Sequence, residues 1–165
     1  MLLYLMRHGI AIDREDPGCP PEAERFLTSE GVQKTREVAR GLAAMGIDPD
    51  DFLSSPLVRA VQTAEIVAAE LKFSREKIQR TDALKYPMRP AEFFKGVAET
   101  RSDEVICFGH APPLDEMIAH AVGAPGVFTA LKKSGVVCLQ MDSFRPIRGS
   151  LLWLMHPKAL RRLAG

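Results

Sequence analysis

Two side chains that could bind or attack a ligand directly follow an apolar segment at the start of the chain. Arg7 and His8 come after Leu2-Leu3-Tyr4-Leu5-Met6. Such a run is typical of a buried strand, and open α/β sheets bind ligands at the carboxyl ends of their strands. Gly9 lacks a Cβ and can turn the chain sharply, which would keep this end open. The tripeptide therefore predicts a ligand site, against the alternative of an ordinary solvated turn.

Two further strand ends carry residues of the same kind. Arg59 lies in the helix expected after the strand 51–54, and His110 follows the apolar segment 104–108. If these side chains converge with Arg7 and His8, they form a pocket of two guanidinium groups and two imidazoles. The helix expected to begin at Pro56 would add its N-terminus, and guanidinium forks match phosphate oxygens. The pattern favours a phosphoryl group over a carboxylate. The alternatives are a surface role for Arg59 and a capping role for His110.

In such a pocket His8 is the candidate nucleophile, because a neutral imidazole can attack phosphorus and form a phosphohistidine. The surrounding cations would disfavour protonation of His8 and stabilise the charge on the equatorial oxygens during transfer. His110 would act as an electrostatic donor.

The order of the expected elements predicts an α/β fold. Strands alternate with amphipathic helices, which favours a three-layer sandwich with a mostly parallel central sheet of about five to six strands and an antiparallel closing pair. Residues 10–26 are rich in acids and prolines and are expected to form a loop. The expected strands are 2–6, 51–54, 77–81, 104–108, 136–141 and 150–155, and the expected helices are 28–45, 56–71, 91–97 and 112–123.

Composition limits the class of protein. The 165 residues, 46% hydrophobic and 26% charged, predict one domain over residues 1–165. A net charge of +1 gives no reason to expect nucleic acid as a partner. Three widely spaced cysteines suit a reducing compartment, so we expect a cytoplasmic protein with no membrane segment. Neither a metal-ligand cluster nor a cofactor motif is present, and we expect no metal and no cofactor.

Four segments in order resemble the histidine phosphatase superfamily, which includes phosphatases and phosphoglycerate mutases. They are Leu5-Met6-Arg7-His8-Gly9, Leu27-Thr28-Ser29-Glu30-Gly31, Leu53-Ser54-Ser55-Pro56-Leu57-Val58-Arg59-Ala60-Val61-Gln62-Thr63-Ala64 and Phe108-Gly109-His110-Ala111-Pro112. In size the chain is most similar to the phosphohistidine phosphatase SixA group. The resemblance implies that His8 is phosphorylated and that Arg7, Arg59 and His110 hold the phosphate. It also places Arg25 near the substrate.

One departure from the family bears on the substrate. Many members carry a Leu-x-Glu segment whose glutamate protonates the leaving alcohol, whereas this chain has Leu84-Lys85-Tyr86-Pro87. An alkoxide leaves poorly without an acid, but a phosphohistidine protonated on its distal nitrogen releases neutral imidazole. The missing acid favours a phosphoramidate substrate, although Asp82 or Asp13 could substitute for it.

The expected partner is therefore a phosphorylated histidine-containing protein in signal transduction, or a small phosphorylated substrate. The chain has no large insertion that would form a lid over the expected pocket, and an open pocket rim suits a side chain presented by another protein. Two alternatives stay open at this point: a general small-molecule phosphomonoesterase that uses the same chemistry, and a non-catalytic phosphohistidine-binding adaptor.

Overall fold

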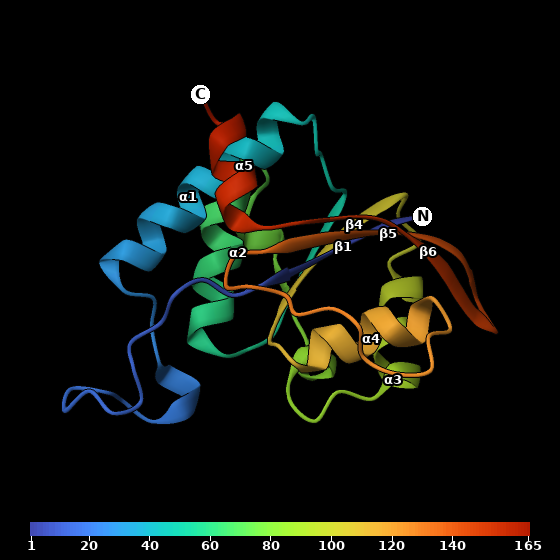
Figure 1. The fold of residues 1–165 in the computed structure, drawn as a ribbon, viewed down its shortest axis with the longest axis horizontal. Coiled ribbons are helices and arrows are strands. Elements are labelled where there is room, and N and C mark those ends of the chain that lie inside the picture. The colour runs from blue at the N-terminus through green and yellow to red at the C-terminus, as the bar shows by residue number, and fades with distance from the viewer.

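A single six-stranded sheet forms the centre of the computed structural model, which describes residues 1–165. The strand order is β3-β2-β4-β1-β5-β6 (Figure 1). β1 to β4 run parallel, and β5 and β6 are antiparallel to their neighbours. The strands are β1 (Leu2–Arg7), β2 (Asp51–Ser54), β3 (Gln79–Arg80), β4 (Glu104–Gly109), β5 (Val136–Phe144) and β6 (Ile147–Met155). The predicted α/β architecture and its antiparallel closing pair are confirmed.

Helices cover both faces of the sheet. α1 (Ser29–Ala44), α2 (Val58–Glu70) and α5 (Pro157–Leu163) lie on one face, and α3 (Pro90–Glu99) and α4 (Pro113–Ala121) lie on the other (Figure 1). Short 3-10 helices span Glu22–Glu24, Arg75–Lys77 and Asp82–Leu84. None of the helices is long and apolar enough to span a membrane.

The apolar runs of the central strands supply both cores. In β1, Leu3 and Leu5 pack with α3 and α4, while Tyr4 and Met6 pack with the helices of the other face. Successive side chains of a strand point to opposite faces, so a strand covered on both sides must be apolar throughout. This packing fixes where β1 ends relative to the helices on both faces, and with it the position of His8.

Several predicted boundaries were wrong. α2 begins at Val58 rather than at Pro56, with Leu57 at its N-cap and no side-chain cap. β5 and β6 extend to a tight hairpin between Phe144 and Ile147, and β3 is only two residues long. The expected loop 10–26 contains the 3-10 turn Glu22–Glu24.

The C-terminal helix α5 was not predicted, because it is short and carries no long apolar stripe. His156 caps it by accepting from the amide of Lys158, and Pro157 follows the cap. Leu160 is fully buried against α1. At Gly41 of α1, an added Cβ would lie 2.1 Å from the carbonyl oxygen of Leu160, so the two helices pack backbone against backbone.

Candidate active site

Three of the predicted site residues meet beyond the carboxyl ends of β1, β2 and β4. Arg59, in the first turn of α2, places its Nε 3.3 Å from Nε2 of His8 and its Nη2 3.5 Å from Nδ1 of His110. The two imidazole rings lie 5.2 Å apart. All three residues are buried, with exposed fractions of 5 to 8%. The expected convergence of His8, Arg59 and His110 is therefore present.

These side chains form the floor of a pocket of about 580 Å³. Arg25 also lines it, which places the residue carried over from the family at the rim. The two candidate acids, Asp13 and Asp82, do not line the pocket, and the Asp82 side chain is 85% exposed. The complete lining is His8, Arg14, Glu22, Ala23, Arg25, Leu57, Arg59, Lys85, Tyr86, His110, Ala111, Pro112 and Pro113.

Arg7 lies beside this pocket and lines two adjoining grooves. Its Nη1 donates to the carbonyl oxygen of Leu131 at 2.9 Å, while its Nε is buried and has no acceptor. The Arg7 charge nevertheless contributes to lowering the pKa of both His8 and His110. Arg7 thus does not line the pocket with His8, Arg59 and His110, contrary to the predicted convergence of all four side chains, and its Nε is a buried donor that lacks the partner such groups almost always have.

The Gln-Thr pair of the α2 motif holds the loop behind His8 in place. The Thr63 hydroxyl donates to the carbonyl oxygen of Arg59 at 2.7 Å and accepts from the amide of Gly9 at 3.0 Å. The Gln62 side chain accepts from the amide of Leu27 at 2.7 Å. These bonds join the first strand end to the helix that carries Arg59, and they explain why the motif requires these residue types.

Gly9 has a different role from the one predicted. It does not line the pocket, its φ is not positive, and its amide is already bonded to Thr63. A Cβ at this position would lie 2.4 Å from Oγ1 of Thr35, which is itself bonded to the Ser134 hydroxyl. Gly9 is required because the chain packs closely against α1.

The hydrogen bonds of His8 fix its tautomer. Nδ1 lies 2.7 Å from the carbonyl oxygen of Gly9, which can only accept, so Nδ1 carries the proton. Nε2 then keeps its lone pair and faces Arg59. Burial, followed by the charges of His110, Arg59 and Arg7, lowers the pKa of His8 from 6.5 to about 3. At neutral pH the ring is uncharged, as a nucleophile must be.

His110 is held by Ser55, the residue after β2. Its Nε2 lies 2.8 Å from the Ser55 hydroxyl. Burial and the Arg59 charge lower the pKa of His110 from 6.5 to about 4. A doubly negative ligand beside this ring would favour its protonated form, because an opposite charge raises the pKa of an imidazole.

Sequence reasoning missed Glu22, which lies inside the expected loop. Its carboxylate pairs with Arg14, Arg25 and Arg59. Two of these arginines were predicted to bind phosphate. No local pattern marks Glu22, because its contacts depend on the path of residues 10–26.

The segment where relatives carry their acid does reach the pocket. Lys85 and Tyr86 line it, and Tyr86 is 72% exposed. The rim therefore presents a cation and an open aromatic face at this position, and no carboxyl group.

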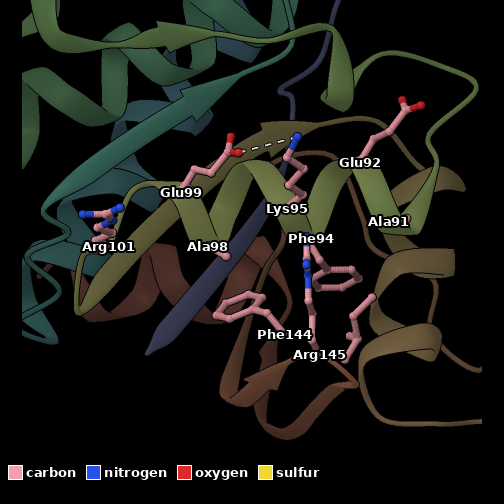
Figure 2. A pocket seen from close by; sticks show the side chains of 10 residues that line it. Ala91, Glu92, Phe94, Lys95, Ala98, Glu99, Arg101, Phe144 and Arg145 are labelled. Atoms are coloured by element: carbon pink, nitrogen blue, oxygen red, sulfur yellow. Dashed lines mark ion pairs between the residues drawn. The ribbon is translucent and has the colours of Figure 1, made fainter.

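A second groove, of about 670 Å³, lies between α3 and the β5–β6 hairpin (Figure 2). Phe94 and Phe144 contribute apolar surface to it, and Lys95 pairs with Glu99 at its edge. It contains no histidine and none of the predicted site residues, which lie in or beside the His8 pocket.

Fold and site together define an α/β protein with two buried imidazoles and a buried guanidinium gathered at the carboxyl ends of its parallel strands. The sequence profile of the histidine phosphatase superfamily (branch 1) matches residues 3–86. The chain is 35% identical over 147 residues to an uncharacterized protein of Picosynechococcus sp., and the match covers 88% of each chain. This chain belongs to the histidine phosphatase superfamily. It also resembles the mitochondrial serine/threonine-protein phosphatase Pgam5 of Drosophila ananassae, at 32% identity over 46% of this chain and 25% of that protein.

Solved structures with the same fold have different substrates. A structure of the protein histidine phosphatase SixA with tungstate aligns with a TM-score of 0.80 at 23% identity, covering 97% of this chain and 99% of that one. The phosphoserine phosphatase of Entamoeba histolytica aligns with a TM-score of 0.70 at 16% identity, covering 96% of this chain and 98% of that one. At these identities the likeness establishes the fold alone.

Proposed function

We propose that this protein is a phosphatase that transfers a phosphoryl group to His8 and then hydrolyses the phosphohistidine. The observation that carries the proposal is the uncharged His8 ring, whose Nδ1 proton is bound by a carbonyl oxygen and whose Nε2 faces Arg59. Nε2 forms the new bond to phosphorus as the bond to the leaving group breaks. Water then attacks the phosphorus, which releases inorganic phosphate and restores His8.

Arg59, Arg7, Arg25 and His110 are the proposed phosphate ligands. Arg25, Arg59 and His110 line the pocket together with His8, and Arg7 lies beside it, so their donors surround the place where the negative charge of the transferring group would develop. Preorganised donors in a site that excludes water stabilise such charge strongly.

The proposed substrate is a phosphohistidine on another protein. The pocket lining contains one carboxyl group, Glu22, whose pKa is lowered to about 2, so no side-chain carboxyl in the pocket is protonated at neutral pH. An alkoxide would have to leave without a proton from a side-chain carboxyl, whereas a phosphohistidine protonated on its distal nitrogen leaves as neutral imidazole. The likeness in fold to SixA is consistent with this class of substrate.

A competition experiment tests the substrate class. The purified protein is offered a phosphohistidine-bearing phosphocarrier protein and an alkyl phosphate ester such as glycerol phosphate in the same assay. We expect kcat/KM for the phosphocarrier to exceed that for the ester by at least two orders of magnitude, on the scale of general-acid effects of about 10²–10⁴-fold. Faster hydrolysis of the ester would indicate a small-molecule phosphomonoesterase instead.

A further inference from the structure

The outward side of the Arg59 guanidinium is occupied by a single residue of the protein. Nη1 donates to the carbonyl oxygen of Glu22 at 2.8 Å, and Nη2 donates to its carboxylate at 2.8 Å. Only Nε of Arg59 is directed at His8. The carboxylate therefore occupies Nη2, the arm of the fork that, together with Nε, would offer a phosphoryl group a bidentate pair of donors, while the backbone carbonyl of Glu22 occupies Nη1.

The Glu22 carboxylate also forms ion pairs away from Arg59. Arg14 donates to Glu22 through Nε at 2.9 Å and through Nη2 at 3.1 Å, and the Arg14 side chain is 71% exposed. Arg25 donates more weakly to both carboxylate oxygens of Glu22, through Nη1 at 3.3 Å, and is itself held in place by two bonds to the carbonyl oxygen of Ile12, at 3.1 and 2.7 Å. Arg59 is buried. Arg14 is thus the exposed member of the three, and Glu22, itself half-exposed, can move outward with it.

Glu22 is not a substitute for the missing proton donor. The hydrogen bond from Arg14, followed by the charges of Arg59 and Arg25, lowers the pKa of this carboxyl to about 2. It is ionised throughout the neutral range, so its chemical role is that of an anion.

We propose that Glu22 is an internal competitor for the phosphate site, which pairs with Arg59 in the free enzyme, moves away with Arg14 when a phosphoryl group binds, and returns to expel inorganic phosphate. The inference rests on the proposed function of the His8 pocket. A returning carboxylate weakens the binding of the product, and a substrate carried on a protein can offset that loss through contacts outside the pocket.

Titration of the protein with inorganic phosphate, followed by calorimetry, tests the proposal. Glu22→Gln keeps the size of the side chain and removes its charge, and we expect it to lower the Kd for phosphate about tenfold, the scale of one charged hydrogen bond. Glu24→Gln is the matched control, because Glu24 is an exposed acid two residues away in the same turn. Its Kd should equal that of the wild type. An unchanged or raised Kd in Glu22→Gln would overturn the proposal. A raised Kd would mean that Glu22 only positions Arg59, so that its replacement leaves Arg59 misplaced for binding phosphate.

A double-mutant cycle with Arg14 separates the two possible roles of that residue. Arg14→Gln should raise the Kd for phosphate several-fold, because the displaced Glu22 carboxylate loses its ion-pair partner. It should have no effect in the Glu22→Gln background. An effect of Arg14→Gln that persists in that background would mean that Arg14 binds phosphate itself, and would contradict the proposal. Failure of the proposed function has a different signature: the wild type would show no phosphatase activity, whereas the order of the phosphate Kd values among the variants tests the role of Glu22 alone.

Discussion

The two buried histidines of the pocket predict a loss of stability in acid that can be assigned to individual residues. The pKa of His8 is lowered from 6.5 to about 3 and that of His110 to about 4, chiefly by burial. Between these values and 6.5 the unfolded chain binds more protons than the folded one, so the free energy of unfolding falls as the pH falls. At pH 4.5, two units below the ordinary histidine pKa, each histidine should lower the free energy of unfolding by about 3 kcal/mol relative to pH 8, at about 1.4 kcal/mol per pH unit.

The perturbation that isolates one of these contributions is His8→Asn. The amide nitrogen of asparagine can still donate to the carbonyl oxygen of Gly9, so the loop keeps its bond while the titrating ring is lost. Urea unfolding from pH 8 to pH 4.5, followed by the fluorescence of the single tryptophan, measures the free energy of unfolding. The wild type should lose about 3 kcal/mol more than His8→Asn over this range. His120→Asn, which removes an exposed imidazole of α4, controls for the loss of a histidine as such. A difference between wild type and His8→Asn that stays constant with pH would refute the reasoning.

Further predictions concern catalysis and packing. Arg59→Lys keeps the charge but loses the planar fork, and should lower kcat/KM about 10²–10³-fold in steady-state assays; a loss under fivefold would contradict a phosphate-binding role. Ser55→Ala removes the partner of the second imidazole and should lower kcat about tenfold; because this hydrogen bond is buried, the change should also lower the free energy of unfolding by about 1–3 kcal/mol. Gly41→Ala should lower Tm because its Cβ meets the α5 backbone at 2.1 Å, whereas Gly96→Ala, in open space on α3, should raise stability by about 0.5–1 kcal/mol. Equal effects in thermal melts would mean that the two helices do not pack so closely.

The parts of the fold that the sequence predicted well are those set by local pattern. The apolar runs before His8 and His110 are typical of strands covered on both faces, and such strands end at one edge of a parallel sheet. The convergence of the two imidazoles follows from that rule. The role of Thr63 lay within a recognised motif, although its partner Gly9 becomes apparent only in three dimensions.

The parts that escaped prediction depend on long-range contacts. Glu22 lies in a polar, proline-rich segment, and its pairing with Arg59 spans residues that no periodicity connects. Helix α5 has only one fully buried side chain, Leu160, and is stabilised by packing against α1 rather than by its own pattern. Gly9 was assigned to a sharp turn, but its constraint is the side chain of Thr35. In each case the deciding contact comes from a distant part of the chain.

The central claim is that His8 becomes covalently phosphorylated. Rapid mixing with a ³²P-labelled phosphoryl donor, followed by quenching in alkaline detergent to preserve phosphohistidine, tests it most directly. The wild type should carry label at His8 during turnover, and His8→Ala should carry none. Turnover without label on the wild type, or undiminished label on His8→Ala, would contradict the account.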